Sequence, residues 1–551
     1  MRIRFLWLGT FLLNLALVGC GSSSNQATPD GGPGAAAEAG AAAEAGAAAE
    51  AGAAGTPPGA PAACPVVVKA ADCDTTQRPI LFVHGTYSSG MDIEHMAALL
   101  GSNGFCQDRI ATIDYDSVAA TPGLSGGGVD SPGADCTAPN TPSGCGIIDR
   151  AITALLKKYP QFTQVDLAGH SQGTFHCGTY LGLHADRVAH YINFSGVPAV
   201  GDVQTLSLSS ERDLFGFPHH ATGTSVCAFH QVADGGTEAV LPDGGTEAVL
   251  PEGGADGSAT GDGGAGCNVV QVTFNHQDHF AVAASKDSFV QVYKYLTGKA
   301  PKYTDIQCGD DPVTVEGIAE TFADNVPIAG KIEIREVGPT PRDTAAPTMT
   351  VTGDASGHFG PVMLKRNVEY VFVGYDASGK LVGWEYLTPF KRDNHNVRLL
   401  APASGSDGSP VGVLVAAQST DHVVSSATTS VVIARWAEGG IRQDLGASLK
   451  VNGAEVLSSD NSGLNAAMTM SLQGGVAALF LEDANKNGKT DLGLAYSTTF
   501  IAFTDAFVSA AQPAFVNLTF TGGSEDPATV DVPVAIDNYP STQGLVEVVF
   551  Q

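Results

Sequence analysis

The chain has 551 residues, enough for two or three domains, and 43% of them are hydrophobic, so large cores can be buried. Only 15% are charged and the formal net charge is −29, which excludes most nucleic-acid binders because phosphates need Lys and Arg. The same charge disfavours a purely electrostatic grip on anionic lipid. An acidic, glycine-rich surface is typical of a soluble exported protein.

The N-terminus predicts export and a lipid anchor. Residues 1–4 are basic, and residues 5–18 form an apolar run of secretory length, too short for a membrane span. The run ends in the sequence Leu-Val-Gly-Cys20, which resembles a bacterial lipobox, so we expect a diacylglyceryl group on Cys20. Residues 1–20 are then a lipoprotein signal peptide, and Gly21, which is not aspartate, favours the outer membrane or cell surface. An ordinary signal peptide with a chance cysteine is the alternative.

Two low-complexity segments cannot form a core. Residues 21–62 repeat Ala-Ala-Ala-Glu-Ala-Gly units among Gly, Pro and Ser, which predicts a disordered tether. Residues 233–266 contain Asp-Gly-Gly-Thr-Glu-Ala-Val-Leu-Pro twice in tandem, which predicts a surface insertion.

Between the tether and residue 303, strand-like and helical segments alternate, which predicts a mostly parallel sheet with helices on both faces. This is an α/β domain over residues 63–303, interrupted by the insertion. The expected strands are 79–83, 109–115, 164–168, 188–194, 203–208 and 269–274. The expected helices are 92–100, 147–159, one from Gln172, and 282–296.

From residue 304 to 551 short strands dominate, punctuated by Gly, Asp, Asn and Ser, which predicts an all-β accessory region of one or two sandwiches or barrels. The expected strands are 331–335, 368–373, 396–400, 431–435, 476–481 and 516–520.

Ten cysteines in an exported chain predict disulfides, and setting aside Cys20 leaves an odd number, so at least one thiol is expected to be free. Proximity in the sequence favours three pairs: Cys64 with Cys73, Cys136 with Cys145, and Cys227 with Cys267. Cys106, Cys177 and Cys308 stay unassigned.

The sequence Gly169-His-Ser-Gln-Gly173 follows a predicted strand and precedes a predicted helix. In a G-x-S-x-G elbow the chain turns so sharply that side chains beside the serine would collide with the neighbouring strand and helix, so glycines flank it. Ser171 is the predicted nucleophile. Gly169, His170 and Gly173 are the other elbow residues.

A serine needs a base to take its proton, and this fold predicts the chain order Ser, acid, His. Two histidines follow the last strand of the sheet; we favour His279 over His276. Asp213 follows the preceding strand and is the predicted acid, with Glu211 as runner-up. Asp166 lies inside its strand and is expected to be a structural hydrogen-bonder.

The loop after residues 79–83 should supply one backbone donor to an oxyanion and the residue after the nucleophile the other, which assigns Thr86 and Gln172. His84 and Gly85 shape that loop. The long loop 115–146, rich in Gly, Ser and Pro, is either a lid or an ordinary surface excursion.

The sequence predicts no cofactor, and no CxxC pair or His cluster has zinc spacing. One calcium candidate places Asp483, Asn485, Asn487 and Asp491 at loop spacing, but Leu494 stands where a bidentate carboxylate is needed. We favour an Asx-rich hairpin turn there.

Three segments resemble motifs of bacterial and archaeal α/β-hydrolase lipases: 79–85 (PILFVHG), 168–173 (AGHSQG) and 279–285 (HFAVAAS). Segments 357–361, 368–370 and 384–392 resemble the C-terminal β domain of the two-domain archaeal long-chain lipase family. The resemblance covers about residues 78–522 and implies that the β region assists lipid-substrate binding. Ser195 occupies the place of an acidic residue in the relative, so the assignment of Asp213 depends on its position in the fold.

These features together predict an exported, lipid-anchored serine ester hydrolase whose substrate is a lipid or fatty-acid ester. The bacterial membrane that holds the anchor is a second expected partner, and the sequence predicts nothing about protein partners. One alternative is an esterase for short or polymeric esters. Another is a non-catalytic binding lipoprotein on a hydrolase scaffold, against which the order Ser171, Asp213, His279 argues.

Overall fold

The computed structural model describes most of the chain from residue 64 onwards, all of it within one compact unit, 55–551. The described residues are 64–86, 88–117, 144–196, 203–213, 226–232, 269–322, 324–338, 346–401, 431–442, 446–457, 476–480, 501–505, 515–522, 531–537 and 545–550. The predicted signal peptide with Cys20, the tether, the 233–266 insertion and the calcium candidate lie outside them. None of the helices in these ranges is long and apolar enough to cross a membrane.

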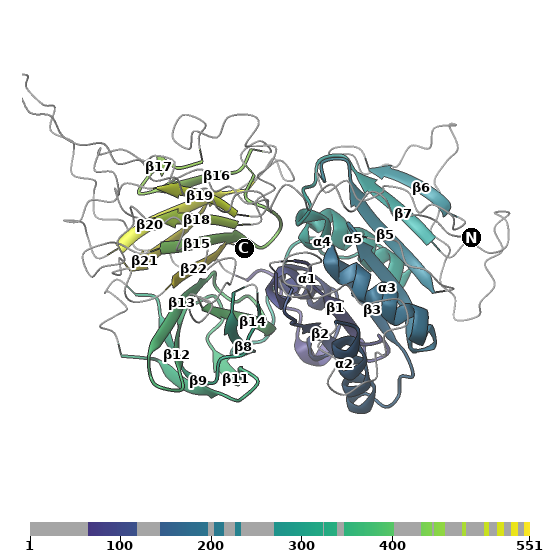
Figure 1. The fold of residues 1–551 in the computed structure, drawn as a ribbon, viewed down its shortest axis with the longest axis horizontal. Helices are drawn as coiled ribbons and strands as arrows, with labels where there is room; N and C mark the ends of the chain where they lie inside the picture. The colour runs from purple at the N-terminus through teal and green to yellow at the C-terminus, as the bar shows by residue number, and fades with distance from the viewer. Residues whose placement is uncertain are drawn as a thin grey trace, which may run out of the picture. The chain divides into compact units, whose positions relative to one another are not determined.

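The first region contains a seven-stranded parallel sheet in the order β2-β1-β3-β4-β5-β7-β6 (Figure 1). Its strands are β1 Ile80–Val83, β2 Ile110–Ile113, β3 Val165–His170, β4 Val188–Phe194, β5 Gln204–Ser210, β6 Val226–Val232 and β7 Val269–Phe274. Six of these strands confirm the prediction. The edge strand β6 was not predicted.

Helices cover both faces of this sheet, as expected for a parallel sheet. The α-helices are α1 Glu94–Ser102, α2 Gly144–Lys158, α3 Gln172–His184, α4 Ala281–Ala284 and α5 Lys286–Thr297, and the 3-10 turns are η2 Ala70–Asp72, η3 Gly90–Ile93, η4 Gln107–Arg109 and η5 Ala185–Arg187. Successive β1 residues face opposite layers: Phe82 packs in the core of α1 and α5, and Val83 in the core of α2 and α3. The α/β-hydrolase type of fold is thereby confirmed.

The helix predicted over residues 282–296 is two helices, α4 and α5. Ser285 separates them because its backbone is extended and its hydroxyl oxygen accepts from the Ser288 N–H, which caps α5. This break lies a few residues after His279.

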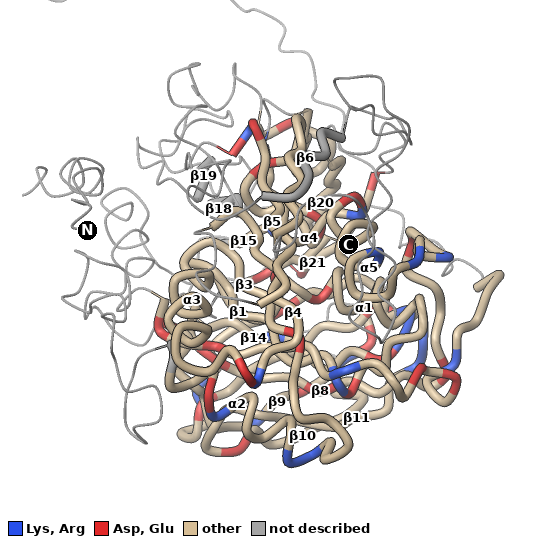
Figure 2. The backbone as a smooth tube through the Cα atoms, turned by 90° about the vertical axis from the view of Figure 1, so that its right-hand side faces the viewer, with Lys and Arg blue, Asp and Glu red and all other residues tan. Residues whose placement is uncertain are grey.

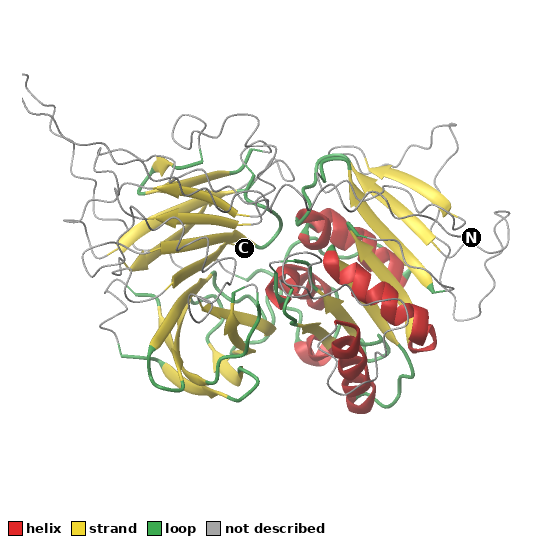
Figure 3. Cartoon of the chain, in the orientation of Figure 1, coloured by secondary structure: helices red, strands yellow, loops and turns green. Residues whose placement is uncertain are grey.

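The rest of the chain is built from strands, and the described residues after α5 contain no helix (Figure 3). Its strands form sheets in the orders β10-β9-β12-β13-β22-β15-β18-β19, β11-β8-β14 and β17-β16-β20-β21. The strands are β8 Val313–Thr321, β9 Gly330–Glu336, β10 Met349–Gly353, β11 His358–Leu364, β12 Tyr370–Asp376, β13 Leu381–Leu387, β14 Asn394–Ala401, β15 Val431–Trp436, β16 Ser448–Val451, β17 Ala454–Glu455, β18 Val476–Phe480, β19 Ile501–Asp505, β20 Phe515–Thr521, β21 Val532–Asp537 and β22 Leu545–Phe550.

The eight-stranded sheet buries both of its faces. Along β12, Phe372 packs in a core with the three-stranded sheet, whereas Val371 and Val373 pack in a second core with the four-stranded sheet. This period of two is that of a strand with both faces covered. The all-β prediction is confirmed, as two sandwich-like layers that share one sheet.

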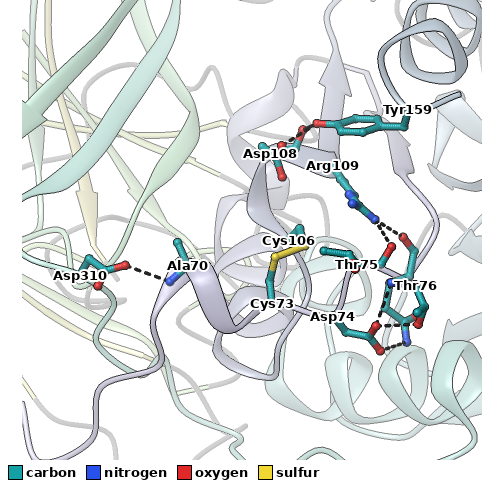
Figure 4. Close-up of a disulfide and its surroundings, with 11 residues drawn as sticks. Ala70, Cys73, Asp74, Thr75, Thr76, Cys106, Asp108, Arg109, Tyr159 and Asp310 are labelled. Carbon is teal, nitrogen blue, oxygen red and sulfur yellow. Dashed lines mark hydrogen bonds between the residues drawn. A yellow bond between two sulfur atoms is a disulfide. The ribbon is translucent and has the colours of Figure 1, made fainter. Parts of the chain in front are cut away.

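Two disulfides differ from the pairing predicted from proximity in the sequence. Cys64 bonds Cys308, and Cys73 bonds Cys106, so the predicted Cys64–Cys73 pair is wrong. The fold brings η2 beside η4, and Cys73 and Cys106 flank those turns (Figure 4). Cys177 is a free, buried thiol. The two other predicted pairs involve side chains outside the described residues: Cys136 with Cys145, and Cys227 with Cys267.

Charged residues are sparse along the described backbone, as the composition requires (Figure 2). Several charged side chains are nevertheless largely buried where strands of the β-rich region contact the α/β region. Arg398 of β14 lies 2.7 Å from Asp114, and Arg435 of β15 lies 3.3 Å from Asp92. We call this set the charged seam, and its members are Asp92, Glu94, Asp114, Glu320, Glu385, Arg398, Arg435 and Glu547.

Candidate active site

Ser171 is held in a strained backbone conformation between β3 and α3. Its φ is 51° and its ψ is −119°, outside the regions that non-glycine residues usually adopt. The strand before it is fully buried between β1 and β4, and its own N–H donates to the Phe194 carbonyl oxygen at 3.0 Å. The side chain is thus fixed at the carboxyl edge of the sheet, next to the N-terminus of a helix, where a developing negative charge is favoured.

The glycines on either side leave no room for a side chain. A Cβ on Gly173 would lie 2.4 Å from the Val83 carbonyl oxygen, and one on Gly169 would lie 2.9 Å from the Cys177 sulfur. These are the clashes with strand and helix that the G-x-S-x-G spacing predicts. The spacing is therefore a packing requirement of the turn that presents Ser171.

His279 and Asp213 meet although 66 residues separate them. Asp213 lies three residues past the end of β5, and His279 lies five residues past the end of β7. The His279 Nδ1 is 2.8 Å from the Asp213 Oδ2, and both side chains are buried. Because Nδ1 donates to the carboxylate, the neutral ring presents Nε2 as a proton acceptor.

The competing residues lie elsewhere. His276 contacts Asp287 at 3.4 Å and the Asn275 side chain at 2.9 Å, and Glu211 is exposed. Asp166 accepts from Arg78 and contacts His190, as expected of a structural hydrogen-bonder. The structure thus brings Asp213 to His279 and leaves both runners-up outside the pair.

Two further contacts lie around His279. His170 Nε2 donates to the His279 carbonyl oxygen at 2.9 Å, and the two rings lie 4.7 Å apart. Burial, together with the neighbouring His279, lowers the pKa of His170 to about 3, so the ring is neutral, and its proton lies on Nε2 because a carbonyl oxygen can only accept. The Asp278 Oδ1 accepts from the Phe280 N–H and the Ala281 N–H at the start of α4. No local pattern predicts the His170 contact, because it joins residues 109 positions apart.

The predicted oxyanion residues also meet. Thr86 Oγ1 donates to the Gln172 Oε1 at 2.7 Å. A Cβ on Gly85 would lie 2.9 Å from the Ser171 Cβ, so the loop after β1 passes directly beside the serine. We call residues 84–86 and 88 the oxyanion loop, after the role that the sequence predicts for Thr86.

Ser195, which stands where the relative has an acidic residue, brings no carboxylate to the site. Ser195 follows β4, is buried, and its N–H donates to the Leu208 carbonyl oxygen at 2.8 Å. The carboxylate that contacts His279 comes one strand later in the sheet, after β5. Among the described residues no group of His, Cys, Asp and Glu is arranged to hold a metal ion.

One family model matches the chain. Residues 311–404 match the model described as Lipase C-terminal domain. No curated protein matches the sequence significantly.

Solved structures give weak likenesses. The Bacillus licheniformis lipase BlEst2 in propeptide form is 12% identical, over 86% of this chain and 96% of that one, with a TM-score of 0.23. Phospholipase PlaB from Legionella pneumophila is 9% identical, over 60% of this chain and 97% of that one, with a TM-score of 0.22. For an extracellular α/β-hydrolase from a Paenibacillus species the identity is 15% and the TM-score 0.15. There the match spans 22% of this chain but only 41% of the other.

A parallel, helix-covered sheet of α/β-hydrolase type thus precedes strands whose residues 311–404 carry the signature of the lipase C-terminal domain.

Proposed function

We propose that this protein is a serine ester hydrolase that acts on lipid esters, with Ser171 as nucleophile, His279 as base and Asp213 as acid. The observation that carries the proposal is the buried 2.8 Å contact between His279 and Asp213, at the sheet edge that also presents the strained Ser171. Strain at a single serine of an elbow is characteristic of a nucleophile.

In the acylation step the Ser171 Oγ attacks the ester carbonyl carbon while the His279 Nε2 takes its proton. The carboxylate of Asp213 stabilises the imidazolium that forms. The backbone N–H groups of Thr86 and Gln172 donate to the oxyanion of the tetrahedral intermediate. When the intermediate collapses, the C–O bond to the alcohol breaks, and His279 returns the proton to the leaving alkoxide.

In the deacylation step a water molecule attacks the acyl carbon and His279 again takes the proton. The bond between Ser171 and the acyl group breaks, the proton passes back to the Ser171 Oγ, and a carboxylic acid leaves. Every step uses these side chains, backbone donors and water.

A lipid substrate is favoured over short or polymeric esters by the lipase C-terminal domain match at residues 311–404. Each methylene of an acyl chain that is buried contributes about 0.8 kcal/mol, so a protein surface that covers several methylenes would select long chains. The proposal assigns that selection to the β-rich region.

The proposal includes export and a lipid anchor at Cys20, supported by the lipobox-like sequence and by two disulfides, which persist in oxidising compartments. Metabolic labelling with a fatty-acid probe should mark the wild-type protein and not Cys20→Ser. Equal labelling of both proteins would refute the anchor and leave the hydrolase proposal standing.

The hydrolase is tested with p-nitrophenyl esters from acetate to palmitate. Wild-type protein should hydrolyse them, and Ser171→Ala should lose at least about 10³-fold in kcat while its unfolding curve stays unchanged. Full activity in folded Ser171→Ala would contradict the nucleophile, and absence of hydrolysis in the wild type would contradict the class.

A further inference from the structure

A side chain of the β-rich region reaches into the catalytic half of the molecule. Asn325 lies in the turn between β8 and β9, and only 7% of it is exposed. Its Nδ2 donates to the Ser88 carbonyl oxygen at 2.9 Å and to the Tyr115 carbonyl oxygen at 3.0 Å. Ser88 is the last residue of the oxyanion loop, and Tyr115 follows β2. One amide therefore joins two loops at the carboxyl edge of the parallel sheet.

The third neighbour of this amide is the ring of His84, the first residue of the oxyanion loop. The His84 Nδ1 lies 2.7 Å from the Gly85 carbonyl oxygen and must donate to it. Its Nε2 is then an acceptor, 3.2 Å from the Asn325 Nδ2 and 3.3 Å from the Tyr115 N–H. Burial lowers the pKa of His84, which keeps the ring in this neutral form.

These three acceptors fix the orientation of the Asn325 amide. With the amide turned over, its oxygen would face two carbonyl oxygens and a ring nitrogen lone pair, which is a repulsive arrangement. The site accepts a hydrogen-bond donor and rejects an acceptor. The backbone of Asn325 is also specialised, with a φ of 50°, a left-handed conformation that Asn and Gly tolerate best.

The held loop is the one that lies against the nucleophile. Gly85 is so close that a Cβ would come within 2.9 Å of the Ser171 Cβ, and the Tyr115 hydroxyl donates to the His84 carbonyl oxygen at 2.7 Å. Asn325 contacts both ends of the loop, at His84 and Ser88. The position of the Thr86 N–H between these ends follows from where they are held.

We infer that Asn325 is a positioning residue for the oxyanion loop, so that the β-rich region takes part in assembling the catalytic site as well as in binding lipid. The inference rests on the proposed function, since it assigns Asn325 to the transition-state step of that reaction. An oxyanion donor contributes about 10²- to 10³-fold in kcat, and a misplaced donor loses part of that. The binding of the neutral ester should be unaffected.

The experiment uses the full chain and a short soluble ester, p-nitrophenyl butyrate, which avoids effects on lipid binding. Asn325→Gly keeps the left-handed backbone and removes the donor. Asn452→Gly is the matched control, because Asn452 is an exposed Asn in the same conformation, with a φ of 48°, in the turn between β16 and β17. Titration with a p-nitrophenyl phosphonate counts the active sites, so that kcat refers to folded protein.

We expect Asn325→Gly to lose about 10- to 100-fold in kcat per titrated site, with KM within about threefold of the wild type. Phenylboronic acid, which forms a negatively charged tetrahedral adduct with the serine, should bind more weakly in proportion. Asn452→Gly should match the wild type in both measurements. A loss of less than about fivefold per titrated site in Asn325→Gly would overturn the inference, as would an equal loss in the control.

A second variant gives a readout that a purely structural role would not move. In Asn325→Asp a carboxylate faces three acceptors, and only its protonated form can donate. The ratio of its kcat to that of the wild type should therefore rise as the pH falls from 8 to 5, while the same ratio for Asn325→Gly stays flat. A flat ratio for Asn325→Asp would overturn the inference.

The two proposals fail differently. If the wild type hydrolyses no ester, or Ser171→Ala retains activity, the proposed function is contradicted, and the inference about Asn325 is contradicted with it. If the wild type is active and Ser171→Ala is not, the Asn325 variants decide the inference alone.

Discussion

The two regions of this chain build their sheets by different rules. In the seven-stranded sheet every pair is parallel, and all strands end at a common carboxyl edge. In the eight-stranded sheet β22, the last strand of the described residues, lies between β13 and β15, so Trp384 pairs with Val546. The first arrangement gathers loops at one edge. The second joins distant parts of the chain and is complete only when residues 545–550 are in place.

The two regions therefore contribute differently to the candidate site. The parallel sheet presents Ser171, Asp213 and His279 from three different strand ends, and the β-rich region contacts the loops around them from outside. Asn325 holds the oxyanion loop, and the Gly440 N–H donates to the Asp278 Oδ2 at 2.9 Å, next to His279. The regions differ in how they fold, but the candidate site depends on both.

The largest expected effect comes from separating them. A truncation that ends at residue 303 would leave Asp114 and Asp92 without their arginine partners and Cys64 without Cys308. Removing the β-rich region also exposes the apolar surface that packs against it, including Met91, and burial of apolar surface supplies most of the small net stability of a domain. We expect no soluble, folded fragment by circular dichroism and size-exclusion chromatography. A folded, fully active fragment 1–303 would show that the regions are independent.

From the sequence alone, the parallel sheet could be predicted well because its strands are apolar runs that alternate with helices. Strand order and the shared edge then bring Asp213 to His279. The β-rich region resists the same reasoning: β22 is central, yet nothing local marks Leu545–Phe550 as a partner of β13 and β15. The Cys64–Cys308 bridge and the Asn325 contact could not be predicted for the same reason. Each depends on long-range packing that proximity in the sequence does not encode.

The next largest effect concerns the residues that the parallel sheet brings together. His279→Ala should lose about 10³-fold or more in kcat, and Asp213→Asn a similar factor, because the base loses its ring or its orientation. His276→Ala and Glu211→Gln are matched controls that should stay within about threefold. Initial rates on p-nitrophenyl butyrate give the comparison. An inactive His276→Ala beside an active His279→Ala would assign the base to the other histidine.

The two disulfides allow a smaller test, because one lies within the α/β region and the other joins it to the β-rich region. In the chain-entropy model the loop closed by Cys73–Cys106, with a sequence separation of 33, contributes about 4 kcal/mol. The bridge Cys64–Cys308 spans 244 positions and should contribute about 1–2 kcal/mol more. Urea unfolding of the two Cys→Ser double variants measures both. A greater loss without the shorter bridge would contradict the entropic ranking.

The smallest effect concerns Glu94, a carboxyl of the charged seam that accepts from the Asn394 side chain at 3.1 Å. Burial raises the pKa of Glu94 to about 8, so the folded protein keeps a proton that the unfolded chain releases above pH 4.5. Stability is therefore highest below pH 4.5 for this group and is lost as the pH rises toward 8, by up to about 1.4 kcal/mol per pH unit. Glu94→Gln cannot ionise and still offers an oxygen to Asn394.

Urea unfolding of the wild type and Glu94→Gln at pH 5, 6.5 and 8 tests whether the seam between the regions holds a proton. The free energy of unfolding of the variant should fall less steeply as the pH rises. The difference in stability between variant and wild type should be largest at pH 8, where wild-type Glu94 must either be buried as a charge or take up a proton on folding. Glu336→Gln is the control, because Glu336 pairs with Lys365 at the surface, where such a pair contributes about 0–1 kcal/mol. Parallel pH curves for the wild type and Glu94→Gln would mean that Glu94 is ionised in the folded protein. The Arg398 and Arg435 guanidiniums would then have to balance its charge, and the seam would bind the two regions by ion pairing alone.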